Sequence, residues 1–245
     1  MKFLHVKYYL QSAWTVFWVT VFTGFFGLLA ILFSLFERKG RAANLCGRLW
    51  AGSLFFVCGV RYDAAGLEHI EQNQNYIVMA NHQSGLDIPL LFLTLPLQIR
   101  MMAKKELFRI PVFGWALSLG GYIKIHRSDR EKAIAAMDAA ARRIRREQVS
   151  VVIFPEGTRS PDGTLQEFKK GGFMFALQTG LPVLPVTIRG THELAPKKSL
   201  AIQPGSIELA VHEAVDTGRY SVETREELIQ KVRSSIQNDL DENYV

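Results

Sequence analysis

The sequence predicts an α/β fold: one layered α/β domain preceded by an N-terminal helical hairpin that is embedded in a membrane. Two observations lead to this class. Residues 8–36 carry no charged side chain, whereas after Asp63 short apolar runs alternate with helical patterns, as in layered α/β domains. A chain of 245 residues can bury one sizeable core. We therefore divide it into an anchoring hairpin, residues 1–60, and a single α/β domain, residues 61–245.

The first apolar segment, Tyr8–Phe36, is longer than the roughly 18 apolar residues that indicate a membrane helix. A cleaved signal peptide would have an apolar core of only about 7–15 residues and an A-x-A-like site, which does not follow here. A second apolar segment, Leu49–Val60, is too short to span a bilayer of about 30 Å. Cations precede the first segment and separate the two: Lys2, Lys7, Arg38, Lys39, Arg41 and Arg48. Both flanks therefore favour one membrane face, which fits a hairpin in one leaflet slightly better than a single span.

The α/β domain is predicted from apolar runs and from helix-capping patterns. The predicted strands are Tyr76–Ala80, Gln98–Ala103, Gly121–His126, Ser150–Phe154, Val183–Ile188 and Ser206–Val211. Two amphipathic helices are predicted after capping boxes, which pair Ser128 with Glu131 and Thr224 with Glu227.

Composition restricts the possible ligands. Lys and Arg outnumber Asp and Glu by 29 to 23, and the excess lies in residues 97–172. Such a field suits an anionic partner, although Arg142–Arg146 is interpreted more simply as a solvated surface. The two cysteines, Cys46 and Cys58, lie among apolar residues without a CxxC motif or a nearby histidine. They therefore indicate neither a zinc site nor a disulfide framework. We also expect no other metal site and no cofactor.

The stretch NHQSGLD, residues 81–87, directly follows a predicted strand, where α/β sheets usually place their sites. On a helix, the side chains of His82 and Asp87 would point roughly 140° apart. A turn that folds back after Gly85 would instead bring the carboxylate onto the imidazole. Such a pair can act as a general base, provided that other residues bind a substrate. A lone histidine at this place would more often be structural.

Three further segments supply candidate binding residues. In FPEGTRSPDG, residues 154–163, Pro155 and Gly157 predict a turn whose backbone N–H groups can face an anion. Arg159 could grip the same anion bidentately, although a plain polar turn is equally compatible with this segment. In residues 104–129, cations bracket an aromatic stretch, which suits a phosphate beside an acyl or bilayer surface. LPVLPVTIRGTH, residues 181–192, is interpreted most simply as a core strand.

The ordered blocks NH-x4-D, KKELF-x-IP-x-FGW, FPEGTRS and LPV-x-P-V resemble those of the 1-acyl-sn-glycerol-3-phosphate acyltransferases of the glycerolipid acyltransferase superfamily. The resemblance covers residues 75–192, and the hairpin looks like the anchor of the bacterial members. It implies transfer of a fatty acyl group from acyl-CoA or acyl carrier protein to lysophosphatidic acid, giving phosphatidic acid for phospholipid biosynthesis. It also implies a place in a cell inner membrane or cytoplasmic membrane, with the catalytic domain on the cytoplasmic face.

The resemblance assigns roles to matching residues. His82 is the implied general base, and Asp87 orients it. The implied substrate-binding residues are Lys105, Arg127, Glu156, Gly157, Thr158 and Arg159. Pro185 matches the last block, which is associated with the acyl donor or with fold integrity. His126 departs from the pattern, since many members carry an apolar residue or Asp there, and it receives no role.

Other functions fit the sequence less well. Another lysophospholipid, a lyso-aminolipid or glycerol-3-phosphate could replace the acceptor, because acyltransferases that act on them share these blocks. A thioesterase or lipid hydrolase could use Ser84, but the glycines of a G-x-S-x-G elbow are absent. Nucleotide-binding motifs are also absent, and no specific nucleic-acid binding is expected. A membrane adaptor would explain the anchor and the basic residues but not the four ordered blocks.

Overall fold

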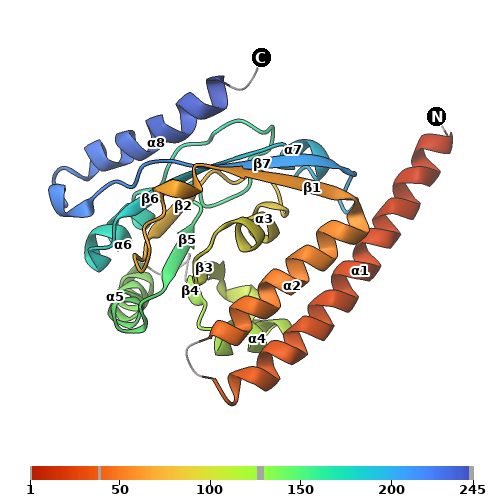
Figure 1. The fold of residues 1–245 in the computed structure, drawn as a ribbon, viewed down its shortest axis with the longest axis horizontal. Coiled ribbons are helices and arrows are strands. Elements are labelled where there is room, and N and C mark those ends of the chain that lie inside the picture. Colours follow the sequence, from red (N-terminus) through yellow and green to blue (C-terminus); the bar gives the residue numbers. More distant parts are fainter. Residues whose placement is uncertain (1, 38–39, 126–129, 243–245) are drawn as a thin grey trace.

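The computed structural model describes residues 2–37, 40–125 and 130–242, and within them it forms a mixed seven-stranded sheet between helices (Figure 1). The strand order is β1-β7-β6-β2-β5-β3-β4, and neighbours are parallel except for β6 and β7. The strands are β1 Val60–Ala65, β2 Ile77–Ala80, β3 Ile99–Lys104, β4 Ile123–Ile125, β5 Ser150–Ile153, β6 Val183–Arg189 and β7 Gly205–Val211. The α/β class predicted from the sequence is confirmed.

Helices cover both faces of the sheet. The α-helices are α1 Lys2–Ser34, α2 Arg41–Cys58, α3 Asp87–Thr94, α4 Phe113–Leu119, α5 Arg130–Glu147, α6 Lys170–Thr179, α7 Thr191–Leu194 and α8 Arg225–Glu242. Short 3-10 turns are η1 Leu67–His69, η2 Lys105–Arg109 and η3 Thr217–Arg219. One core cluster joins α2 and α3 to the sheet, and a second joins α5, α6 and α8 to its other face. Because both faces are covered, the central strands β2 and β5 are apolar and buried throughout.

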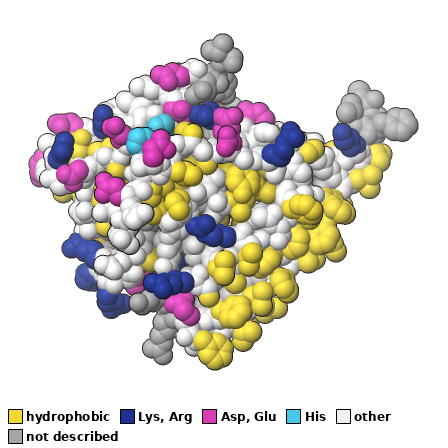
Figure 2. Space-filling view, viewed as in Figure 1, with side chains coloured by type: hydrophobic (Ala, Val, Ile, Leu, Met, Phe, Trp, Pro, Cys, Tyr) yellow, Lys and Arg dark blue, Asp and Glu magenta, His cyan; other side chains and the backbone are white. Residues whose placement is uncertain are grey.

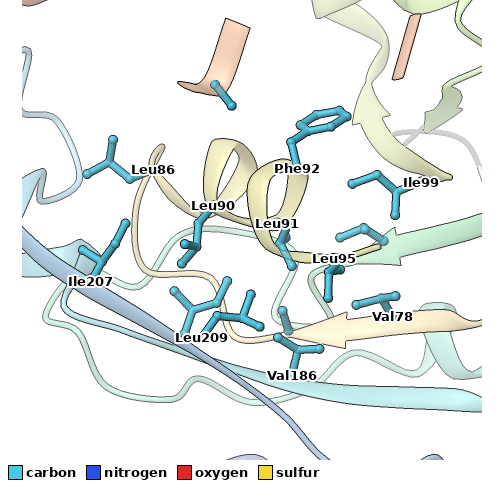
Figure 3. Packing of buried hydrophobic residues seen from close by; sticks show 14 of the residues in the cluster. Val78, Leu86, Leu90, Leu91, Phe92, Leu95, Ile99, Val186, Ile207 and Leu209 are labelled. Carbon is cyan, nitrogen blue, oxygen red and sulfur yellow. The ribbon is translucent and has the colours of Figure 1, made fainter. Parts of the chain in front are cut away.

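The helix α3 holds the site loop against the sheet. Leu90 and Leu91 of α3, and Leu95 directly after it, are fully buried and point toward the sheet, where they share one core cluster with Val78 and Val186 (Figure 3). Burial of a leucine side chain stabilises a fold by about 1.5–3 kcal/mol, so this packing fixes the first turn of α3 firmly. That first turn begins at Asp87.

Six of the seven strands lie where the apolar runs predict them, with ends that differ by one or two residues in most cases. The strand β1 was missed, because its sequence VRYDAA is polar and largely exposed. The strand β4 is shorter than predicted, because Gly121 still belongs to the preceding turn, with a φ of 80°, and the strand begins only at Ile123. Both His126 and the capping residue Ser128 lie outside the described residues. At α8, the Thr224 hydroxyl accepts from the N–H of Ser221, and the Glu227 N–H donates to the Thr224 carbonyl. The Glu227 N–H thus bonds to the carbonyl of Thr224, whereas the predicted capping box would require a bond to its hydroxyl.

The hairpin helices α1 and α2 lie side by side along one edge of the molecule (Figure 1). Residues Val6–Ser34 have a mean hydropathy of 2.3 and are long and apolar enough to cross a membrane. The hairpin is also attached to the α/β domain. Gln11 donates to the Ile202 carbonyl at 2.7 Å, and the Thr15 hydroxyl accepts from the Ile202 N–H at 3.2 Å. The second half of α2 adds Ala51, Leu54, Phe55 and Cys58 to the core.

Candidate active site

Three loops meet at the carboxyl edge of the central strands. The segment NHQSGLD follows β2, FPEGTR follows β5, and Gly190 with Thr191 follows β6. These strands are parallel neighbours, with β2 between β6 and β5. Their carboxyl ends therefore converge, as they do at the sites of open α/β sheets.

The first loop brings His82 and Asp87 together, as the predicted turn requires. The His82 Nδ1 atom lies 2.7 Å from Asp87 Oδ2. The same carboxylate oxygen accepts the backbone N–H groups of Gln83 at 2.8 Å and Ser84 at 2.9 Å. Asp87 is fully buried, while the His82 side chain keeps 16% exposure. The loop thus wraps around the carboxylate and presents the imidazole at its surface.

The imidazole of His82 is fixed in one orientation. Its ring stacks on Phe154, with centroids 3.9 Å apart and an interplanar angle of 15°. Because an ionised carboxylate only accepts hydrogen bonds, the neutral ring carries its proton on Nδ1, facing Asp87. The other nitrogen, Nε2, then holds the lone pair that can accept a proton.

Glu156 joins the second loop to the first. It is 2% exposed, and its Oε1 accepts the backbone N–H of His82 at 2.8 Å. Its Oε2 accepts the N–H of Gln166 at 3.3 Å. Burial raises the pKa of Glu156 to about 7; the two backbone hydrogen bonds oppose the shift, and the charge of Asp87 adds to it. These contacts place Glu156 beneath the loop, and the acceptor contact that the resemblance implies stays a prediction.

The predicted turn at Gly157 is present, but two backbone N–H groups of this segment already donate hydrogen bonds within the protein. Gly157 has a φ of 73°, and its N–H donates to the Phe154 carbonyl at 3.0 Å. The N–H of Ser160 donates to the His82 carbonyl at 2.7 Å. The Gly157 N–H therefore closes the turn itself, and the Ser160 N–H ties the two loops together. Neither of these two groups faces an anion, and the anion contact predicted for the other N–H groups of this turn stays a prediction.

Cationic side chains surround the same loops. Arg159 lies against the first loop, since a methyl group added at Gly85 would stand 3.8 Å from Arg159 Nη1. Lys197, which no sequence motif indicates, donates to the Arg159 carbonyl at 2.7 Å and lies 3.4 Å from the Thr158 hydroxyl. Lys169, also indicated by no motif, covers Gly157, where an added methyl group would stand 3.1 Å from its Nζ. Both lysines occur in ordinary KK pairs, so only the fold distinguishes them.

For the remaining predicted site residues, the structure gives the element in which each one lies. Lys105 opens η2 directly after β3, at the same carboxyl edge of the sheet, and Arg127 lies outside the described residues. Pro185 is buried within β6 opposite Met79, and its carbonyl accepts the His212 N–H at 3.0 Å. This position favours a role of Pro185 in the integrity of the fold over a role in contact with the acyl donor.

Ser84 has no geometry of a nucleophile. It is fully buried, its hydroxyl donates to the Ala195 carbonyl at 2.7 Å, and it accepts the Leu86 N–H at 3.2 Å. The imidazole of His82 bonds to Asp87 through Nδ1, and not to this hydroxyl. Among the described residues, no group of three or more His, Cys, Asp or Glu side chains is placed to hold a metal ion.

Comparisons with known proteins identify the family. A family model described as Acyltransferase matches residues 61–189. The chain is 32% identical over 192 residues to the 1-acyl-sn-glycerol-3-phosphate acyltransferase of Limnanthes alba, covering 78% of this chain and 68% of that protein. It is 29% identical over 230 residues to 1-acyl-sn-glycerol-3-phosphate acyltransferase alpha of Homo sapiens, covering 94% and 80% of the two chains.

A solved structure matches almost the whole chain. The crystal structure of the 1-acyl-sn-glycerophosphate (LPA) acyltransferase PlsC from Thermotoga maritima is 32% identical, with a TM-score of 0.83 and coverage of 97% of this chain and 96% of that chain. The region matched by the family model, residues 61–189, includes both the His82–Asp87 pair and the FPEGTR turn. The chain is therefore an enzyme of the acyltransferase family, the family of the 1-acyl-sn-glycerol-3-phosphate acyltransferases.

Proposed function

We propose that this enzyme transfers a fatty acyl group from acyl-CoA or acyl carrier protein to the sn-2 hydroxyl of 1-acyl-sn-glycerol-3-phosphate, with His82 as the general base. The observation that carries the proposal is the 2.7 Å contact between His82 and Asp87, with Arg159 beside the same loop. The names of its relatives support lysophosphatidic acid as the acceptor and phosphatidic acid as the product.

The proposed reaction begins when His82 Nε2 accepts the proton of the acceptor hydroxyl. The oxygen attacks the thioester carbonyl carbon, and a C–O bond forms as the carbonyl becomes tetrahedral. The C–S bond then breaks, and the imidazolium returns its proton to the leaving thiolate. Asp87 stabilises the imidazolium and holds its tautomer throughout. The products are the diacyl ester and the free thiol, and no cofactor is consumed.

A cationic binding site would explain why the acceptor carries a phosphate. A guanidinium fork pairs two phosphate oxygens at once, and Arg159 lies next to the loop that carries the base. Lys105 starts from the same edge of the sheet. We propose these two side chains, with Arg127 and the Thr158 hydroxyl, as the binding site for the glycerol phosphate. Such a site favours a phosphomonoester over a neutral glycerol.

We infer that residues 1–60 anchor the enzyme to a cell inner membrane or cytoplasmic membrane, with the domain of residues 61–245 on the cytoplasmic face. Exposed apolar side chains follow α1, including Leu10 at 68%, Phe17 at 57% and Phe25 at 57%. Figure 2 shows that hydrophobic side chains gather along the hairpin edge. Because α1 also bonds to Ile202 of the domain, insertion into one leaflet fits better than a full span.

The test is transfer by the purified full-length enzyme, with lysophosphatidic acid and either donor. The substitution His82→Ala should lower the rate by about 10²–10⁴-fold, the usual effect of a lost general base. His69→Ala, a change at a half-buried histidine in η1, serves as the control and should retain normal turnover. A folded His82→Ala enzyme with near-normal turnover would end this mechanism.

The acceptor is tested separately. A panel of lysophosphatidic acid, glycerol-3-phosphate, a lysophospholipid with a large headgroup and a lyso-aminolipid is offered with each donor. We expect the highest kcat/KM for lysophosphatidic acid. A higher value for another acceptor would reassign the substrate while leaving the His82 mechanism intact.

A further inference from the structure

The buried carboxylate of Asp87 has a partner that lies far away in the sequence. Its Oδ2 atom is contacted by His82 and by two backbone N–H groups of the loop. Its Oδ1 atom accepts the hydroxyl of Thr191 at 2.6 Å. Both Asp87 and Thr191 are fully buried. The hydroxyl therefore holds the side of the carboxylate that faces away from the imidazole.

The fold fixes this contact through the ends of two neighbouring strands. Asn81, next to His82, donates to the Ile188 carbonyl at 2.8 Å and accepts the Ile188 N–H at 2.7 Å. This double hydrogen bond locks the end of β2 to the end of β6. Gly190 then turns the chain with a φ of 79°, and Thr191 begins α7.

The short helix α7 is also attached at its other end. The Ser84 hydroxyl donates to the Ala195 carbonyl at 2.7 Å, and the Ala195 N–H donates to the Thr191 carbonyl at 3.1 Å. The start and the end of α7 therefore both bond to residues of the NHQSGLD loop. Thr191 cannot move away from Asp87 without breaking these contacts.

We propose that Thr191 is a positioning residue, which acts through Asp87 to set the orientation and the proton affinity of His82. The proposal rests on the proposed function, since it requires His82 to be the base. A hydrogen bond to a charged group is stronger than one between neutral groups, and a buried carboxylate oxygen left without a partner carries the full cost of desolvation. Loss of the hydroxyl makes the carboxylate more basic and leaves its plane less restrained.

Two consequences separate positioning from simple structural support. The chemical step slows, because the imidazole is less well aligned, so kcat falls while the KM for the acceptor changes little. A more basic carboxylate also makes the His82–Asp87 pair bind its proton more tightly. The acid limb of the rate profile then moves to higher pH.

Other charged groups near the pair are unchanged among the variants to be compared. Glu156 bonds to the His82 N–H, Arg159 lies beside Gly85, and His192 follows Thr191 in α7. Glu156 interacts with the charge of Asp87 and has a raised pKa. A difference between variants at position 191 therefore reports the hydroxyl, and not the titration of these groups.

The experiment compares Thr191→Val with Thr191→Ser in the full-length enzyme. Thr187→Val is the matched control, because Thr187 is equally buried in β6 and its hydroxyl lies 2.7 Å from His212 Nε2, outside the NHQSGLD loop. With lysophosphatidic acid and acyl-CoA, Thr191→Val should lower kcat by about 10- to 100-fold and move the acid limb upward. Thr191→Ser should restore kcat to within a few-fold, and Thr187→Val should keep the wild-type profile.

Thermal unfolding checks that each variant is folded, and Thr191→Cys replaces Thr191→Val if the latter does not fold. If Thr191→Val matches Thr187→Val in both kcat and acid limb, the proposal is wrong. His82→Ala is measured in the same series. An inactive His82→Ala beside an unaffected Thr191→Val refutes only the role of Thr191, whereas an active His82→Ala refutes the proposed mechanism itself.

Discussion

The buried carboxyl of Glu156 should make the stability of this enzyme depend on pH, and Glu156→Gln should remove that dependence. Glu156 is 2% exposed, and its pKa is raised from 4.5 to about 7 by burial. Between these values the folded state binds more protons than the unfolded state. The free energy of unfolding therefore falls as the pH rises through this window, and the loss is complete above about pH 7.

The magnitude follows from the two pKa values. A difference of one pKa unit corresponds to about 1.4 kcal/mol, so the rise from 4.5 to about 7 amounts to about 3 kcal/mol. Glutamine is neutral at every pH and keeps one acceptor oxygen for the His82 N–H. Relative to the wild type, Glu156→Gln should therefore gain about 3 kcal/mol of stability between about pH 4 and pH 8.

Urea unfolding in detergent micelles at several pH values measures this difference. Glu167→Gln is the control, because Glu167 is exposed in the same segment. Parallel pH curves for the wild type and Glu156→Gln would refute the reasoning. Steady-state kinetics give a second result, since a positioning role predicts a lower kcat at unchanged acceptor KM. A rise in the acceptor KM alone would instead support the substrate contact that the family resemblance implies.

Three further changes test the site and the anchor. Asp87→Asn should lower kcat at least about 10²-fold, because the amide no longer offsets the imidazolium charge. The pH profile of kcat measures this effect, and a kcat equal to that of the wild type would contradict it. Arg159→Lys should raise the acceptor KM by about 10- to 100-fold through loss of the guanidinium fork, and an effect on the donor KM alone would place Arg159 on the donor side. The double change Phe17→Glu and Phe25→Glu should weaken vesicle binding at least about 10²-fold in flotation assays, because burial of each exposed phenylalanine in the bilayer contributes about 1.5–3 kcal/mol. The control Val222→Glu, at an exposed position near α8, should bind vesicles normally.

The sequence predicted those parts of the fold in which local pattern and burial agree. The strands β2 and β5 are apolar along their whole length, since helices cover both faces of the sheet. The edge strand β1 carries polar, exposed residues, so periodicity could not distinguish it from a loop. The division at residue 60 stays a proposal, and Phe55 shows why. It lies in the hairpin by sequence but is buried in the core of the α/β domain.

The site was predictable where its residues are close in sequence. His82 and Asp87 lie in one loop, so a turn alone could bring them together, and the structure has that turn. Thr191 and Lys197 were missed because their partners lie 104 and 38 residues away. Neither contact leaves a local pattern, since each depends on which strands are neighbours in the sheet.

The same sheet order explains why the three loops work as one unit. With β2 between β6 and β5, the loop that carries His82 has a neighbouring loop on each side. On the β5 side, Glu156 and Ser160 bond to the N–H and the carbonyl of His82 itself. On the β6 side, Thr191 bonds to Asp87. The base is thus held through its backbone from one side and through its carboxylate from the other, which leaves the Nε2 edge of the ring as the part that can meet an acceptor hydroxyl.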